Sequence, residues 1–142
     1  FNRAYKKAEE GDYYGAISDY SKAIEINPRS AVAYYNRGVN KSDLKDYSGA
    51  ISDYSKAIEI NPKYAKAYYN RGYAKDDLKD YSGAIADFSK AIEINPRDSN
   101  AYYNRGISKF NTGDKKGACE DWKKAAELGD EDAAELLKEH CE

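Results

Sequence analysis

Apolar residues recur along the chain at intervals of three and four, which is the spacing of one face of an α-helix. Between residues 47 and 60 they fall at Ala50, Ile51, Tyr54, Ala57 and Ile58. A strand would alternate apolar and polar residues, and this segment does not. The pattern predicts helices over 13–26, 47–60, 81–94 and 115–128.

Polar residues mark where these helices begin and end. An aspartate precedes each run, where its side chain can accept from the free N–H groups of a first helical turn. The Asn61-Pro62 pair follows one run and predicts a helix end, because proline lacks the N–H. A second helix type begins at the recurring AYYNRG segment, with Ser30 as its cap in one copy. The four capping aspartates are Asp12, Asp46, Asp80 and Asp114.

The helix pairs belong to a repeat of 34 residues. The segment from Ala33 to Pro62 returns at Ala67 to Pro96, and its first half returns again from Ala101. Because a period of this length indicates stacked helical hairpins, we predict one domain. Its parts are a truncated repeat 1 (1–30), repeats 2 (31–64), 3 (65–98) and 4 (99–130), and a capping helix (131–142).

Glycine recurs within the first helix of each pair, although it costs about 1 kcal/mol there relative to alanine. Close helix packing would offset this cost, so we expect each small residue to face an alanine of the second helix, such as Ala50 opposite Gly38. An aromatic residue would fill the space one turn further along. The small residues are Ala4, Gly38, Gly72 and Gly106, the alanines Ala16, Ala50, Ala84 and Ala118, and the aromatics Tyr20, Tyr54, Phe88 and Trp122.

Composition changes the expected kind of core. Leu, Ile, Val and Phe make up only 20 of 142 residues, about 14%, which is below the roughly 20% typical of folded chains. The net charge is only −2, however, and the chain has 20 Ala and 15 Tyr. Alanine and tyrosine must therefore replace aliphatic bulk. The tyrosines expected in packing are Tyr20, Tyr34, Tyr54, Tyr68 and Tyr102.

Several classes are disfavoured at this point. No apolar run approaches the roughly 18 residues of a membrane span, and a pI of about 5.6 lacks a basic nucleic-acid footprint. Cys119 and Cys141 are too few for a disulfide scaffold. We expect them to be free thiols, which slightly favours a reducing compartment such as the cytoplasm.

These residues resemble those of the tetratricopeptide repeat (TPR) family. The shared features are the 34-residue period, small residues such as Gly38 and Ala50, aromatics such as Tyr34 and Tyr54, and the terminal proline. The resemblance implies an all-α, right-handed α-solenoid of antiparallel helix pairs whose first helices line a concave groove. Near the end, Ala126, Gly129 and Ala133 are similar to a Sel1-like repeat.

Two columns depart from the TPR pattern. Arginine and lysine stand four residues apart in each first helix, and an aspartate recurs in each second helix. The repetition predicts an inter-helix ion-pair ladder, with a track for nucleic-acid phosphates as the alternative. The two departing columns are Arg3, Arg37, Arg71 and Arg105, and Lys7, Lys41, Lys75 and Lys109; the aspartates of the second helices are Asp19, Asp53, Asp87 and Asp121.

Catalytic chemistry has little support in the sequence. His140 is the single histidine and lies in the predicted capping helix, where we expect a solvated or packed side chain. The Asp76, Asp77 and Asp80 cluster could suggest a cation site, but a solvated helix end accounts for it better. We therefore expect no enzyme, catalytic residue, metal site or cofactor.

Binding is easier to place, because one stripe of each first helix would face the groove. Its recurrent elements are an asparagine ladder and a tyrosine row. An amide can bond both the C=O and the N–H of a peptide, and tyrosine adds rigid contact area. We expect an extended peptide or partner segment to bind at Tyr35, Asn36, Val39, Lys66, Tyr69, Asn70, Tyr73, Tyr103, Asn104 and Ile107.

Other functions remain open. Some TPR domains grip chaperone C-termini through groove lysines and arginines; here tyrosine and asparagine occupy most of these positions, and only Lys66 matches. The chain could instead assemble end to end or exchange hairpins through an uncapped N-terminal end. It could also be one domain of a longer enzyme or sensor.

Overall fold

The computed structural model describes residues 1–141, and nine α-helices make up nearly all of this part of the chain. They are α1 (Asn2–Glu9), α2 (Tyr13–Ile26), α3 (Ala31–Asp43), α4 (Tyr47–Ile60), α5 (Ala65–Asp77), α6 (Tyr81–Ile94), α7 (Ser99–Asn111), α8 (Lys115–Glu127) and α9 (Glu131–His140).

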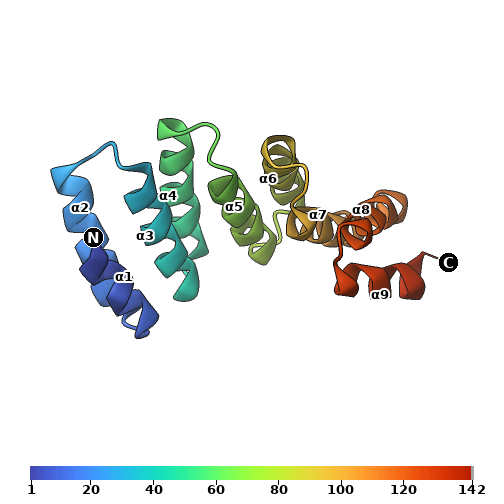
Figure 1. Ribbon diagram of the computed structural model, residues 1–142, viewed down its shortest axis with the longest axis horizontal. Coiled ribbons are helices and arrows are strands. Elements are labelled where there is room, and N and C mark those ends of the chain that lie inside the picture. The colour runs from blue at the N-terminus through green and yellow to red at the C-terminus, as the bar shows by residue number, and fades with distance from the viewer. Residues whose placement is uncertain (142) are drawn as a thin grey trace.

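The helices form consecutive antiparallel pairs that stack side by side into an all-α solenoid (Figure 1). Odd-numbered α1 to α7 are the first helices of the pairs, and α2 to α8 are the second. First helices of neighbouring pairs contact each other at α3–α5 and α5–α7, whereas no second helices within residues 1–141 approach as closely. The first helices therefore line the inner face of the stack, which we call the groove. No helix in this range is long and apolar enough to cross a membrane.

The predicted helix caps are confirmed. Each second helix is preceded by its aspartate, whose Oδ1 accepts from a glycine N–H three residues later; the Asp46–Gly49 distance is 3.0 Å. Ser30 Oγ accepts from the Ala33 N–H at the start of α3. Because these acceptors satisfy donors that the helix leaves unpaired, they fix where each helix begins.

The turns between paired helices need one residue with positive φ. Gly11 and Gly113 supply it in repeats 1 and 4, but Lys45 and Lys79 occupy the same position in repeats 2 and 3, at φ values of 63° and 64°. A side chain in this left-handed conformation is strained, whereas glycine is not. The two central turns therefore carry strain that the outer turns lack.

Close packing of the helix pairs is confirmed, although the nearest neighbour is not the expected alanine. A Cβ at Gly38 would lie 2.7 Å from the Tyr54 ring, and one at Gly106 would lie 2.5 Å from Trp122 Nε1. The second-helix aromatics thus press directly on the first-helix glycines. Tyr54 and its counterparts Tyr20, Phe88 and Trp122 are buried, as expected.

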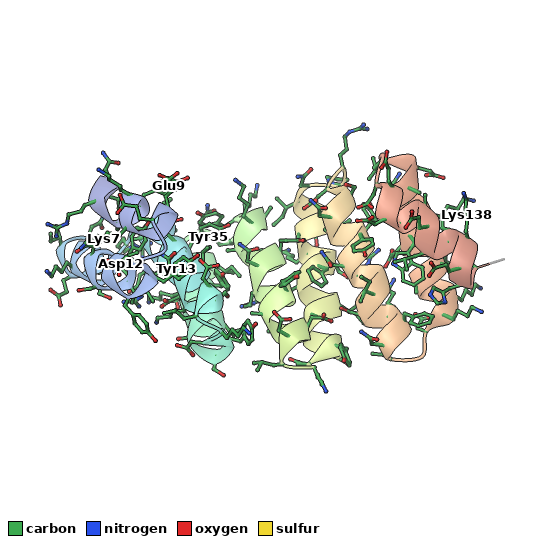
Figure 2. The ribbon with its side chains drawn as sticks, turned by 90° about the horizontal axis from the view of Figure 1, so that it is seen from below. Lys7, Glu9, Asp12, Tyr13, Tyr35 and Lys138 are labelled. Atoms are coloured by element: carbon green, nitrogen blue, oxygen red, sulfur yellow. A yellow bond between two sulfur atoms is a disulfide. The ribbon has the colours of Figure 1, made fainter. Side chains whose placement is uncertain are left out.

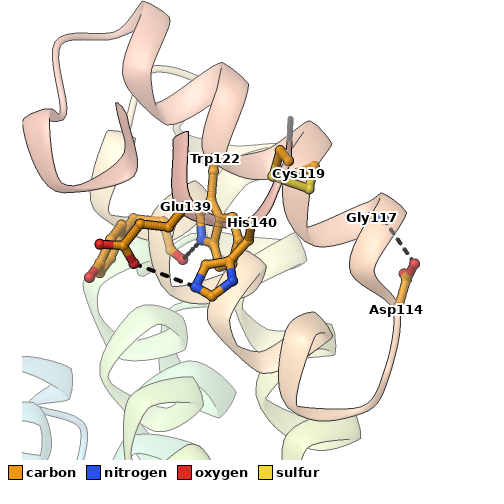
Figure 3. Close-up of a disulfide and its surroundings, with 8 residues drawn as sticks. Asp114, Gly117, Cys119, Trp122, Glu139 and His140 are labelled. Atoms are coloured by element: carbon orange, nitrogen blue, oxygen red, sulfur yellow. Dashed lines mark hydrogen bonds and ion pairs between the residues drawn. A yellow bond between two sulfur atoms is a disulfide. The ribbon is translucent and has the colours of Figure 1, made fainter. Parts of the chain in front are cut away.

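The prediction of two free thiols is wrong. Cys119 and Cys141 form a disulfide, with their Cα atoms 5.9 Å apart (Figure 3). The sequence separation of 22 residues hid this pairing, because α9 folds back along α8 and brings its C-terminal end beside Cys119. The mild preference for a reducing compartment rested on free thiols and therefore lapses.

The predicted capping helix corresponds to α9. Ala133 is buried against Trp122 and Ala125, and Leu136 and Leu137 pack around them. This helix covers the apolar face that α7 and α8 would otherwise expose. The end of the prediction, Glu142, lies outside the described residues.

Candidate functional site: an arginine ladder and a groove of asparagine and tyrosine

The predicted ion-pair ladder is present. In repeat 2, Arg37 donates to both oxygens of Asp53, with Nη2–Oδ1 at 2.7 Å and Nε–Oδ2 at 2.9 Å. Lys41 Nζ lies 3.0 Å from Asp53 Oδ2. Asp53 is buried, and its carboxylate raises the pKa of Arg37 by accepting these hydrogen bonds. The two like charges on α3 are thus held together by one carboxylate on α4.

The arginine also reaches the preceding repeat. Arg37 Nη1 donates to Ser21 Oγ on α2 at 3.0 Å. It stacks on Tyr34 as well, with its guanidinium carbon 5.5 Å from the ring centroid, a favourable cation–π distance. Repeats 3 and 4 have the same contacts, through Arg71 to Asp87 and Ser55 and through Arg105 to Asp121 and Ser89.

Repeat 1 has a looser version of this arrangement. Arg3 bonds both oxygens of Asp19, but at 3.1 Å, and its side chain is 70% exposed against 20% for Arg37. Lys7 and Arg3 both donate to Asp19 and together hold its pKa at about 2. In all four repeats the guanidinium and ammonium groups are already paired within the chain, which disfavours the phosphate-track alternative.

The asparagine ladder is linked to the tyrosine row of the preceding repeat. Asn70 Nδ2 donates to Tyr35 Oη at 2.7 Å, and Asn104 Nδ2 donates to Tyr69 Oη at the same distance. We call each linked pair a rung. Because the hydroxyl accepts from the amide, its own proton stays available, and the amide oxygen is also left to accept. Each rung thus retains at least one donor and one acceptor.

The rung tyrosines are half-buried rather than freely exposed. Tyr35 packs against Tyr54 and Tyr64, with ring centroids 5.8 and 5.0 Å apart, and Tyr69 packs against Phe88 at 5.6 Å. Burial raises the pKa of Tyr69 to about 12, so the hydroxyl keeps its proton near neutral pH. Packing therefore fixes these hydroxyls in place.

The other expected groove residues differ in their surroundings. Lys66 and Tyr73 are exposed, whereas Val39 is half-buried. Tyr103 and Ile107 pack against the cluster around Trp122 beneath α9, and the Tyr103 carbonyl accepts from Trp122 Nε1 (Figure 3). The capping helix therefore takes part of the surface that the repeat pattern assigned to the groove.

Asn36 breaks the rung pattern. The position that supplies the tyrosine acceptor in the later rungs holds Phe1 here, which has no hydroxyl to accept from the Asn36 amide. Phe1 instead packs edge-on against Tyr20, at a centroid distance of 5.5 Å. The first junction therefore has no rung.

A hollow of about 240 Å³ lies at this junction, between α1 and α3. Tyr5, Tyr13 and Tyr20 form its aromatic walls, and Asn36 and Asn40 add amides. Figure 2 labels Tyr13 and Glu9, another lining residue, on the first repeat. Sequence reasoning missed the hollow, because it depends on small differences between repeats rather than on what they share.

Two clusters considered for chemistry have structural roles. Asp76 accepts from Ser108 Oγ at 2.7 Å, and Asp80 caps α6 through Gly83 N–H. His140 packs against Phe110 and Trp122, with its Nε2 3.6 Å from Glu139 Oε2. The described residues contain no group of three or more potential metal ligands.

The fold and the repeated contacts define a helical-repeat protein, and family comparisons identify its type. The TPR repeat model matches residues 4–40 and 43–76, and tetratricopeptide repeat models match 65–98 and 88–120. The chain belongs to the TPR family and is a protein–protein interaction module. The Sel1-like ending expected around Gly129 is not supported.

Solved structures give the same fold. A crystal structure of MamA is 27% identical over 89% of this chain and 74% of that chain, with a TM-score of 0.86. MamA from residue 41 onward, from Desulfovibrio magneticus RS-1, is 26% identical over 88% and 71%, with a TM-score of 0.83. The first TPR of Spaghetti (RPAP3), bound to the HSP90 peptide SRMEEVD, is 25% identical over 77% and 88%, with a TM-score of 0.74. No curated protein sequence matches the chain.

Proposed function

We propose that the chain binds an extended peptide or partner segment along its groove, without catalysing a reaction. The observation that carries this proposal is the repeated rung. Asn70 with Tyr35, and Asn104 with Tyr69, each leave one hydroxyl donor and one amide acceptor after their mutual hydrogen bond. An extended backbone needs both kinds of group, so successive rungs suit a peptide irrespective of its side chains.

The full binding surface would include the residues around the rungs. Lys66 and Tyr73 are exposed and available for contact, and Asn36 and Val39 lie at the first junction. Tyr103 and Ile107 would contribute only the parts of their side chains that the α9 cluster leaves uncovered. The expected site is therefore centred on repeats 2 and 3.

The bound segment is proposed to differ from the acidic peptide in the Spaghetti structure. That peptide is SRMEEVD. Here the ladder cations are paired with aspartates, and tyrosine and asparagine occupy most positions where a carboxylate clamp needs cations. An acidic C-terminus would find Lys66 as the one matching cation predicted from the sequence.

The test uses peptides selected from a random library against the immobilised chain. Replacing Tyr35 and Tyr69 by Phe removes two hydroxyl donors but keeps the packed rings, so selected peptides should bind about tenfold more weakly, since two hydrogen bonds are lost. Asn36, Asn70 and Asn104 changed together to Ala should weaken binding further. Circular dichroism would check that both variants stay helical.

Two controls separate a backbone track from other binding. Tyr81→Phe removes a hydroxyl on α6, outside the proposed site, and should leave affinity unchanged. N-methylation of alternate peptide amides should weaken binding to the wild type if the amide oxygens accept from them. Unchanged affinity in the Tyr35→Phe, Tyr69→Phe variant would reject the rung mechanism.

A second candidate function is self-association through repeat 1. Ile26 is 86% exposed, whereas its counterparts Ile60 and Ile94 are half-buried, and Phe1 and Tyr14 are also exposed. This apolar surface could bind a second copy of the chain. Light scattering across a concentration series tests this proposal. A dimer that is lost in the Ile26→Glu variant would support it, and a monomer at all concentrations would reject it.

A further inference from the structure

The hollow at the first junction is left open because residue 8, which lines it, is a small alanine. The same register position holds Ser42, Asp76 and Phe110 in the later repeats. Ser42 Oγ lies 3.4 Å from the Tyr54 hydroxyl, Asp76 accepts from Ser108, and Phe110 packs on Trp122. Alanine can do none of these things, so repeat 1 lacks the side chain that fills or bridges this position elsewhere.

Two polar groups lose a partner as a result. Asn40 is the register counterpart of Ser108, and the residue facing it in the preceding repeat is Ala8 instead of an aspartate. Asn40 is only 3% exposed, lines the hollow, and its amide forms no hydrogen bond within residues 1–141. Tyr20 likewise has Ala8 where Tyr54 has Ser42, and its hydroxyl forms no hydrogen bond in the same part of the chain. Within residues 1–141 no side-chain nitrogen or oxygen is both sealed from solvent and unpaired, so the polar atoms of these two residues reach open space. Because buried side chains normally pair their polar groups within the protein, the free hydrogen-bonding capacity of Asn40 and Tyr20 is left for a ligand.

The charge of the hollow is negative. Glu9 and Asp43 line its solvent-exposed edge, no Lys, Arg or His lines it, and neither carboxylate forms an ion pair with any residue from 1 to 141. Burial raises the pKa of Asp43, a sign that its charge is poorly compensated.

The remaining walls suit a cation with an apolar stem. Tyr5, Tyr13 and Tyr20 surround the space, and aromatic faces attract ammonium and guanidinium groups. The side-chain amide oxygens of Asn36 and Asn40 can accept hydrogen bonds from the N–H groups of such a cation.

We propose that this hollow is a specificity pocket for a basic side chain, lysine or arginine, of the peptide held in the groove. The proposal rests on the proposed function, because it names the residue type that would set the register of the bound peptide on the track. The methylene stem would lie against the tyrosines, with the charged end between Glu9 and Asp43 and within reach of Asn40. An acidic side chain would meet two uncompensated carboxylates and be excluded.

The test uses single-residue probes, so that it does not depend on the rungs. Nα-acetyl-lysine N-methylamide and the arginine analogue would be titrated into the ¹⁵N-labelled chain, with the uncharged norleucine analogue as the matched control. We expect saturable, millimolar binding of at least one basic probe, reported by the side-chain NH₂ signal of Asn40. The norleucine probe should leave that signal unshifted.

Three variants locate the effect. Ala8→Phe copies the residue of repeat 4 and fills the hollow, so it should abolish the shift; Ser42→Ala changes the same register position outside the hollow and should preserve it. Glu9→Gln with Asp43→Asn keeps the shape but removes the charge, and should weaken binding about tenfold.

Three results would overturn the proposal: no saturable shift with either basic probe, equal shifts with norleucine, or an unchanged shift in a helical Ala8→Phe variant. A shift of Asn40 on raising protein concentration alone would assign the hollow to a second copy and also overturn it. Failure of the rung variants to affect selected peptides would count against the proposed function, but it would leave the probe titration unaffected.

Discussion

The junction between repeats 3 and 4 and the junction between repeats 1 and 2 have the same backbone arrangement but different contacts across it. Arg105 reaches Ser89 at one junction and Arg37 reaches Ser21 at the other, at nearly equal distances. On the groove side, however, the later junction has the Asn104–Tyr69 rung and the Ser108–Asp76 bond, whereas the first has neither. The arginine–serine bond therefore recurs at both junctions, whereas the contacts on the groove side differ between them.

That contrast shows how a repeat protein can vary one surface without losing its fold. The ladder that connects first and second helices is kept in every repeat, while Phe1 and Ala8 remove groove contacts from one junction only. The contacts that recur in every repeat and the contacts that differ between repeats thus involve different side chains of the same helices. The following substitutions test this division, beginning with the largest expected effect.

Loss of a ladder carboxylate in the middle of the stack should be most costly. Asp53→Ala leaves Arg37 and Lys41, both mostly covered, without a counter-charge, and we expect a loss of about 3 kcal/mol in the free energy of unfolding. Asp19→Ala should cost clearly less, because Arg3 can turn to solvent. Urea unfolding followed by circular dichroism measures both; equal losses would show that the end repeat is held as firmly as the centre.

Reduction of the disulfide tests the other end of the stack. Cys119–Cys141 closes a loop of 22 residues, so its loss should cost about 3 kcal/mol, by the loop-entropy relation. Thermal melts with and without reductant would show this as a lower Tm. A Cys119→Ser, Cys141→Ser variant should have the Tm of the reduced protein, and adding reductant should not change that Tm. Two titratable thiols in the untreated, unfolded chain would contradict the pairing.

The rungs can be broken at one junction and built at another. Tyr69→Phe removes the acceptor of Asn104 and should cost about 1 kcal/mol, a typical net value for one hydrogen bond. Phe1→Tyr places a hydroxyl opposite Asn36 and should stabilise by less, because Phe1 is half-exposed. Chemical denaturation of the two variants and their combination measures both effects. A Phe1→Tyr variant that is no more stable would mean that Asn36 is not positioned to form a rung.

The turns give the smallest effect. Lys45 has a positive φ, and Gly11 occupies the same turn position in repeat 1. Because glycine adopts this conformation without strain, Lys45→Gly should raise the free energy of unfolding by up to about 1 kcal/mol. The converse Gly11→Lys should lower it by a similar amount. Thermal denaturation distinguishes these outcomes; destabilisation by Lys45→Gly would show that the lysine side chain contributes contacts that outweigh its backbone strain.

The sequence predicted the fold because every feature that defines it occurs several times. The 34-residue period, the aspartate caps and the glycine–aromatic contacts each recur, so that one copy supports the interpretation of the others. The ladder from Arg37 to Asp53 could be predicted in the same way. The disulfide could not, because two cysteines 22 residues apart show no repeated pattern and become neighbours only through the packing of α9.

The candidate site could be predicted only in part. Periodicity placed Asn70 and Tyr69 on the inner face, but it could not show that each amide donates to the tyrosine of the preceding repeat. That bond depends on how neighbouring first helices are offset. The hollow depends on an exception, Ala8, whose meaning is clear only when the side chains facing it are known.

The arginine that bonds both its own repeat and the one before it also bears on how the stack unfolds. Arg37 donates both to Asp53 of its own repeat and to Ser21 of the preceding repeat. Unfolding of either hairpin therefore removes a hydrogen-bond partner from the other. Nearest-neighbour terms of this kind determine whether a repeat array melts unit by unit or in one step. With one shared arginine at each of the three junctions, the array should behave as a single cooperative unit in which partly unfolded species are scarcely populated.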